Sequence, residues 1–336
     1  GGRVKRGAPP SRWDQGEFNR LARQKWDPRS TKGLSDPRLF WSYNKQLIGG
    51  VLPLSLFAGG HNHFVSQFAQ RRGWKPYSVH TTYQYAAAAG KRHRLREGML
   101  WVDPPRYYDP PEGLLSFKLE VPREMIYPPG GMDTLRHIRL ITYQLKQVKS
   151  ALAIAFTLGR KLVMPRITCG YDKAWYPLSS GFKGNGYKSK GVFPGAHHYI
   201  LPIFDCPLDH FLEVGMLHPE VTIREYSLLD NPRTPRHVTA SITNVELSTA
   251  SASMASEIQR LRTNYPKSKV IHLTNLAKVD AVKDLLTSAQ QSAFMSKFGY
   301  VRGSWCCAPT ADAKNGQPQS ASFSLVQGGG RRRFLG

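Results

Sequence analysis

Apolar side chains recur at every third or fourth position through residues 135–155, and this periodicity narrows the choice of fold more than any other feature. The series runs Leu135, Ile138, Ile141, Leu145, Val148, Leu152 and Ala155. Such spacing predicts a long amphipathic helix with one face in a hydrophobic core. Gly159 fits the position just after such a helix, and residues 161–165 then predict a buried strand.

The same order of helix and strand returns later in the chain. Short apolar runs at residues 221–226 and 269–273 predict strands, whereas residues 253–261 and 279–298 have helical spacing. Helices that alternate with isolated hydrophobic strands predict an α/β fold built in layers.

The N-terminal third is predicted to hold shorter elements. Residues 13–21 have the spacing of a short helix, and residues 47–56 and 63–68 resemble two short strands. Residues 75–83 are rich in β-branched and aromatic side chains, which predicts a strand that ends near His80.

A proline-rich stretch separates these short elements from the long helix. Residues 103–129 contain seven prolines, which exclude a long helix and predict an irregular arm that ends in a linker. The chain is therefore divided into four predicted parts. They are a flexible lead-in at 1–12, a first domain at 13–128, a second α/β layer domain at 129–309 and a disordered basic tail at 310–336.

The composition is that of a folded protein with a strong positive charge. An apolar content of 40% in 336 residues excludes a mostly disordered chain. The 47 Lys and Arg exceed the 23 Asp and Glu, giving a formal net charge of +24, which attracts anions of every kind. No run approaches the roughly 18 apolar residues of a membrane span, and the first 25 residues have no apolar signal-peptide core.

Four cysteines are present, at positions 169, 206, 306 and 307. Their spacing matches no zinc site, since no C-x-x-C pair occurs. They could form two disulfides or none, and Cys169–Cys206 is the first pair to test if the compartment is oxidising.

Four segments together indicate chemistry on a phosphorylated substrate. They are Trp13-Asp14-Gln15 with Phe18-Asn19, the Gly59-Gly60-His61 turn, the strand end Val79-His80-Thr81-Thr82, and Gly90-Lys91. Each has a simpler interpretation by itself, such as a helix N-cap for Asp14. Taken in order, they supply what a nucleotide-sugar enzyme needs to neutralise a diphosphate leaving group: an imidazole for a divalent metal, and nearby Lys and Arg.

The order of these segments resembles one family closely. The strings that carry the resemblance are Gly60-His61 with Phe64-Val65, Pro76-Tyr77 with Val79-His80-Thr81-Thr82-Tyr83-Gln84-Tyr85, Gly90-Lys91-Arg92-His93-Arg94-Leu95-Arg96-Glu97, Arg160-Lys161-Leu162-Val163-Met164-Pro165 and Cys206-Pro207-Leu208-Asp209-His210. They are similar to those of plant and algal hydroxyproline O-arabinosyltransferases, the extensin arabinosyltransferase branch of glycosyltransferase family 77. The similarity covers about residues 13–235.

The resemblance implies a fold and an activity. Residues 13–128 would be the C-terminal portion of a GT-A-like nucleotide-diphospho-sugar transferase domain, followed by the second α/β domain. The implied reaction is retaining transfer of L-arabinofuranose from UDP-arabinofuranose to hydroxyproline-linked arabinan on cell-wall glycoproteins. The implied location is the Golgi lumen, in type II membrane proteins whose anchor would lie outside this chain.

The resemblance also implies roles for individual residues. His80 would be a ligand of a divalent metal, Mn²⁺. The donor diphosphate would be bound by Gly90, Lys91, Arg94 and Arg96. Arg94 and Arg96 would share a face on a strand and diverge on a helix. Asp14 and Gln15 would line the sugar and acceptor side.

One motif of the family does not occur. No Asp-x-Asp sequence is present in the 336 residues, so we expect the metal site to need residues from outside this chain. A non-catalytic Golgi binding or partner protein with the same fold is therefore the first alternative. The second alternative is a basic nucleic-acid-binding protein, which the scattered Lys and Arg residues do not favour.

Overall fold

The computed structural model describes residues 14–24, 34, 36–82, 84, 87–132, 134–170, 203–212, 214, 223–248 and 253–298. The predicted lead-in at 1–12 and the predicted tail at 310–336 lie outside these residues. The helices are α1 Asp14–Ala22, α2 Ala87–Glu97, α3 Pro105–Tyr108, α4 Arg123–Ile126, α5 Thr134–Leu158, α6 Arg236–Thr239, α7 Met254–Asn264, α8 Ala281–Leu285 and α9 Ser288–Phe298. The strands are β1 Leu39–Ser42, β2 Leu47–Gly50, β3 Phe57–Gly59, β4 Ser78–His80, β5 Leu114–Phe117, β6 Lys161–Val163, β7 Ile167–Cys169, β8 Phe204–Cys206, β9 Ile223–Arg224, β10 Ile242–Val245 and β11 Val270–Leu273.

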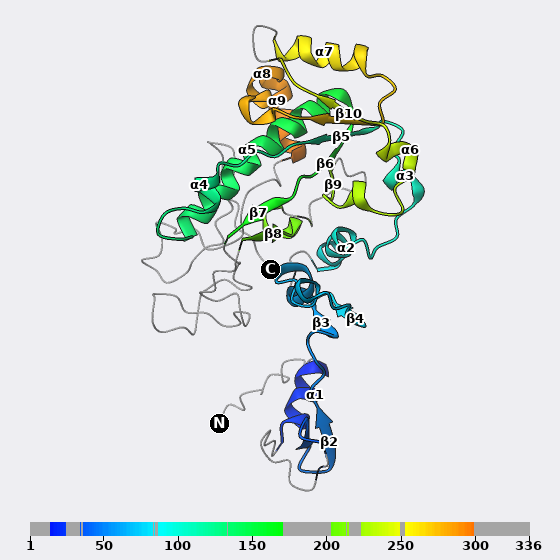
Figure 1. The fold of residues 1–336 in the computed structure, drawn as a ribbon, viewed down its shortest axis with the longest axis vertical. Helices are drawn as coiled ribbons and strands as arrows, with labels where there is room; N and C mark the ends of the chain where they lie inside the picture. The colour runs from blue at the N-terminus through cyan, green and yellow to red at the C-terminus, as the bar shows by residue number, and fades with distance from the viewer. Residues whose placement is uncertain are drawn as a thin grey trace, which may run out of the picture.

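The main body is an α/β unit around a five-stranded parallel sheet, which confirms the predicted α/β class (Figure 1). The strand order is β10-β11-β5-β6-β9, and the register pairs Val270 with Leu114 and Leu162 with Ile223. β5 therefore lies at the centre of the sheet. The predicted division at residue 128 falls after β5, so the sheet takes its central strand from the segment that was assigned to the first domain.

Helix α5 is the long helix that the apolar periodicity predicts. Its side chains Leu145, Val148 and Leu152 are fully buried in the main hydrophobic core, together with residues of β5, β6 and β11. The helix ends at Leu158 because Gly159 takes a left-handed φ of +75°, which favours glycine. The chain then enters β6 directly, as predicted.

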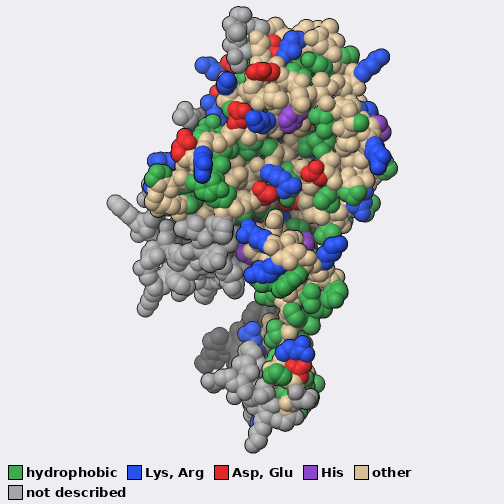
Figure 2. Space-filling view, in the orientation of Figure 1, with side chains coloured by type: hydrophobic (Ala, Val, Ile, Leu, Met, Phe, Trp, Pro, Cys, Tyr) green, Lys and Arg blue, Asp and Glu red, His purple; other side chains and the backbone are tan. Residues whose placement is uncertain are grey.

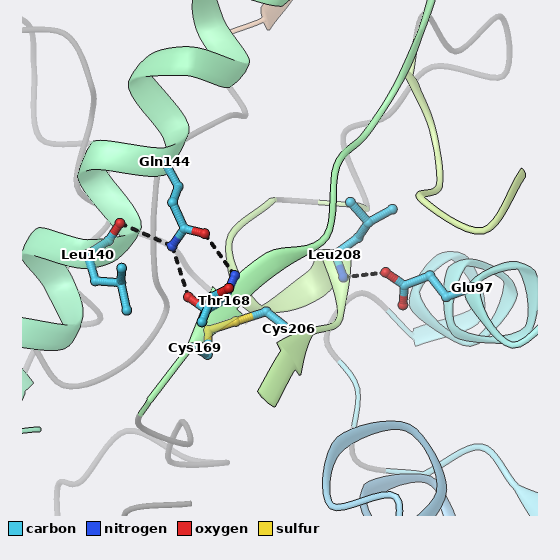
Figure 3. Close-up of a disulfide and its surroundings, with 7 residues drawn as sticks. All are labelled: Glu97, Leu140, Gln144, Thr168, Cys169, Cys206 and Leu208. Atoms are coloured by element: carbon cyan, nitrogen blue, oxygen red, sulfur yellow. Dashed lines mark hydrogen bonds between the residues drawn. A yellow bond between two sulfur atoms is a disulfide. The ribbon is translucent and has the colours of Figure 1, made fainter. Parts of the chain in front are cut away.

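Strands β7 and β8 form a separate antiparallel pair beside the main sheet. A disulfide joins Cys169 to Cys206, with the Cα atoms 5.6 Å apart, so the pair chosen first for testing is the one that forms (Figure 3). Gln144 on α5 fixes the pair further. Its side-chain amide donates to the carbonyl of Thr168 at 2.9 Å and accepts from the N–H of Thr168 at 2.8 Å.

The N-terminal part forms a narrower extension of the molecule. Helix α1 and the antiparallel β1–β2 hairpin lie at the end of the long axis, and the parallel pair β3–β4 lies between them and α2 (Figure 1). The strand predicted at 63–68 is wrong, because residues His61–Val65 form a short π-helical turn, η1, that buries Phe64 and Val65. The strand predicted to end near His80 is confirmed as β4.

No helix among the described residues is both long and apolar enough to cross a membrane.

Candidate functional site

The carboxyl ends of β3 and β4 place a histidine beside a glycine turn. In the parallel register Gly59 is opposite His80, and the imidazole of His80 is exposed at the strand end. Gly60, which follows β3, passes very close to the chain after β4. A Cβ on residue 60 would lie 2.0 Å from the carbonyl oxygen of Thr82. A glycine is therefore required at position 60, and it holds the two strand ends together.

Helix α2 carries Gly90 and Lys91 on different faces. Gly90 is buried, whereas the Lys91 side chain is exposed, as is that of Arg92. The guanidinium of Arg92 lies 5.4 Å from the ring centroid of Trp101. Of the predicted diphosphate ligands, Lys91 is thus the cation that the structure presents to solvent.

Arg94 and Arg96 diverge, as expected for a helix. Arg94 is only 1% exposed, and its Nε and Nη2 donate to the two carboxylate oxygens of Asp209 at 2.7 and 3.2 Å. The guanidinium of Arg96 pairs with Asp103 and lies 4.5 Å from the ring centroid of Tyr107. The Arg94 side chain lies in the interior, paired with Asp209, and its predicted contact with a diphosphate stays a prediction. Arg96 is also engaged by a carboxylate.

A second set of contacts holds the C-terminal end of α2 against the sheet. Ser227, which follows β9, donates its hydroxyl to the carbonyl of Arg96 at 3.2 Å. Tyr107 donates its hydroxyl to the carboxylate of Glu225, and the guanidinium of Arg224 lies 4.2 Å from the Tyr107 ring centroid. Burial is the main cause that raises the pKa of both Tyr107 and Glu225. The helix that carries Lys91 is therefore fixed by buried polar groups.

Glu97, the last residue of α2, belongs to the same buried cluster. Its Oε1 accepts the N–H of Leu208 at 2.6 Å, as drawn in Figure 3. Burial raises the pKa of Glu97 well above its ordinary value of 4.5, and the negative charge of Asp209 raises it further. The positive charge of Arg94 and the Leu208 N–H act in the opposite direction. No sequence pattern indicated Asp209 as the partner of Arg94, although the string that contains Asp209 is one of those that carry the family resemblance.

We expect the Glu97→Gln variant to gain stability relative to the natural protein as the pH rises. The folded state keeps a proton on Glu97 at pH values where the unfolded chain, with a pKa near 4.5, has lost it. Raising the pH through that window therefore destabilises the natural protein and leaves the neutral glutamine unaffected. Urea unfolding at pH 5, 6.5 and 8 measures the difference. A difference that stays constant with pH, or one equal to that of the exposed control Glu124→Gln, would contradict the expectation.

Asp14 and Gln15 are not brought to this site. Both begin α1, which packs against the β1–β2 hairpin, where the hydroxyl of Ser42 donates to the carbonyl of Ala22. Figure 1 shows β3 and β4 lying between α1 and α2. The carboxylate of Asp14 is exposed. Their predicted role at the sugar and acceptor side stays a prediction.

The described residues around His80 do not complete a site for Mn²⁺. Among the described residues, the one group of three potential metal ligands within 4.8 Å of one another is Cys169, Cys206 and His210. Its two sulfurs are joined in the disulfide, so that group is not a metal site in this form. His80 offers a single imidazole, whereas Mn²⁺ prefers carboxylate and other oxygen ligands.

The comparisons with known proteins identify the class to which the chain belongs. No protein-family model matches it, and no solved structure matches it. A curated relative places it with the glycosyltransferases. That relative is arabinosyltransferase XEG113 of Arabidopsis thaliana, which is 41% identical over 245 residues. The match covers 70% of this chain, and the chain is an arabinosyltransferase-related protein. It spans about a third (35%) of the length of that relative.

Proposed function

We propose that this chain forms part of an enzyme that transfers L-arabinofuranose from UDP-arabinofuranose to hydroxyproline-linked arabinan on cell-wall glycoproteins. The single observation that carries the proposal is the 41% identity to an arabinosyltransferase over 245 residues. The finer parts of the proposal are a retaining reaction, a GT-A-like arrangement that includes residues 13–128, and action in the Golgi lumen. They rest on the family resemblance of the strings around His80 and Lys91.

Lys91 is the residue to which we assign contact with the donor. Transfer of a sugar from a nucleotide diphosphate leaves two phosphates whose growing negative charge must be neutralised. The ammonium of Lys91 is exposed, whereas the neighbouring Arg94 and Arg96 are held by Asp209 and Asp103. Because α2 is anchored by those buried pairs, Lys91 is presented from a rigid helix.

We further propose that His80 and the Gly60 turn lie on the same donor side. The parallel register places the His80 imidazole at the end of β4, and Gly60 keeps the adjoining chain within van der Waals distance. His80 would supply one imidazole to Mn²⁺. The oxygen ligands would come from residues outside those described here.

The proposal is tested in a joined polypeptide, in which this chain replaces the matched segment of the Arabidopsis relative. We expect this polypeptide to transfer arabinose from UDP-arabinofuranose to an arabinosylated hydroxyproline peptide. Lys91→Ala should lower kcat/KM by about ten- to a hundredfold, since a hydrogen bond to a charged group contributes roughly 1.5–3 kcal/mol. Transfer is measured with a radiolabelled donor.

The matched control is Lys283→Ala, which removes another exposed helical lysine, on α8. It should leave kcat/KM unchanged. Full activity of the Lys91→Ala and His80→Ala variants would overturn the site assignment. A folded joined polypeptide that transfers no arabinose under conditions where the Arabidopsis enzyme is active would overturn the proposed function.

A further inference from the structure

Exposed apolar side chains are concentrated on the N-terminal extension. Of the fifteen large hydrophobic side chains that are exposed among the described residues, ten lie between residues 18 and 77. We call six of them the N-terminal apolar surface: Ile48, Val51, Leu52, Leu54, Trp74 and Tyr77. They are between 49% and 79% exposed. Figure 2 shows hydrophobic side chains gathered on this narrow part of the molecule. Exposed apolar patches of this kind mark interaction sites.

The extension has little hydrophobic core of its own. Among the described residues between 14 and 82, the buried hydrophobic side chains are Ala58, Phe64, Val65 and Ala69, and of these only Val65 joins the main core. Apolar side chains that would fill a core instead face water. Tyr77, for example, has its ring centroid 6.0 Å from that of Phe57 on the neighbouring strand, and both rings are exposed.

The β3–β4 pair is also incomplete as a sheet. It consists of two parallel strands of three residues each, and the described residues add no third strand to it. Parallel sheets occur almost only where further strands and helices cover both faces. Neither outer edge of the pair has a partner strand among the described residues, and a strand edge without a partner is a template for another strand.

The charge around the surface indicates the chemistry of what covers it. Residues 36–82 contain five Lys or Arg and one acidic residue, Asp36. Arg71, Arg72 and Lys75 lie between η1 and β4, next to Trp74 in the sequence. A segment that binds here would therefore be apolar at its centre and acidic at its rim.

We propose that the N-terminal apolar surface and the open edge of β3–β4 are the docking site for a further strand-bearing segment of the arabinosyltransferase polypeptide. About two thirds of the Arabidopsis relative lies outside the match, which is ample chain to supply such a segment. The segment adds strands to the β3–β4 pair and buries the apolar side chains. The docking of this segment does not depend on the transfer reaction.

The experiment compares this chain alone with the joined polypeptide described above. Hydrogen exchange at the backbone amides of β3 and β4 should slow at least tenfold in the joined polypeptide, because new strands pair with them. Leu52→Lys and Tyr77→Lys should leave the unfolding midpoint of the chain alone unchanged, since both positions are exposed there. In the joined polypeptide the same substitutions should lower the midpoint. The matched control, Ile242→Lys, changes an exposed apolar residue on β10 and should have no such effect in either protein.

Three outcomes would overturn the proposal. The first is unchanged exchange at β3 and β4 in a folded joined polypeptide, or an equal effect of Leu52→Lys in both proteins. The second is a dimer of the chain alone, measured by light scattering, that persists in the joined polypeptide and is abolished by Leu52→Lys, which would make a second copy the occupant. The third is binding of the joined polypeptide to anionic lipid vesicles that requires Leu52 and Tyr77. A joined polypeptide that shows protection at β3–β4 but no transfer would leave this proposal standing and overturn only the proposed function.

Discussion

Asp209→Ala is expected to destabilise the folded chain by about 3–5 kcal/mol, because it leaves the guanidinium of Arg94 buried without its counter-charge. Both side chains are 1% exposed, and the two carboxylate oxygens accept from two guanidinium nitrogens. Removing one partner of such a pair forfeits the Coulomb attraction while the cost of desolvating the remaining charge persists. The midpoint of urea-induced unfolding measures the effect.

A double variant separates this cost from the value of the pair. Arg94→Met combined with Asp209→Leu replaces the ion pair with apolar side chains and should recover most of the stability lost in Asp209→Ala. The control is Glu112→Ala, which removes a partly exposed carboxylate whose ion pairs with Arg106 and Lys161 are 3.7 and 3.9 Å long. Glu112→Ala should lower the free energy of unfolding by no more than about 1 kcal/mol. If Asp209→Ala costs no more than this control, the buried pair does not anchor α2.

The anchoring of α2 explains why the basic cluster could be located in the sequence but not interpreted fully. Residues 91–96 stand out as Lys and Arg in a short run, and the run gives no indication of which cations face water. The partner of Arg94 is 115 residues away, on the 3₁₀ turn η3, Leu208–His210. Only the folded chain brings that carboxylate to α2. The family resemblance included the string that contains Arg94 and the string that contains Asp209, yet it could not show that these two residues contact each other.

The predictability of the fold follows the strength of local periodicity. Helix α5 was predictable because seven apolar positions repeat over six turns, and β11 because its apolar run is bounded by polar residues. Strand β5 was missed. Its four buried residues lie inside the proline-rich stretch, directly after Gly113. So short an apolar run can be strand or loop until neighbouring strands pair with it.

At the π-helical turn η1 the error is the reverse, because a strand was predicted where the structure has none. Residues 63–68 have the β-branched and aromatic composition of a strand, yet the chain turns there to bury Phe64 and Val65. Burial against the rest of the molecule outweighs intrinsic β-propensity, which is a weak preference. For His80, the position at a strand end was predictable from the sequence, whereas its exposure was not.

Replacing Cys169 and Cys206 together with alanine is expected to lower the free energy of unfolding by about 2–4 kcal/mol. The disulfide closes a loop between residues 37 positions apart and ties β7 to β8, and both cysteines are buried. The covalent link restricts the unfolded chain, so its removal favours unfolding.

Cys306 and Cys307, which lie outside the described residues, are replaced by alanine in every protein compared, so that no other pairing interferes. Urea unfolding with and without dithiothreitol measures the effect, and reductant should lower the midpoint only where Cys169 and Cys206 are present. In that background the denatured, unreduced protein should show no thiol that reacts with Ellman's reagent. Two reactive thiols, or equal midpoints with and without reductant, would show that the pair does not form.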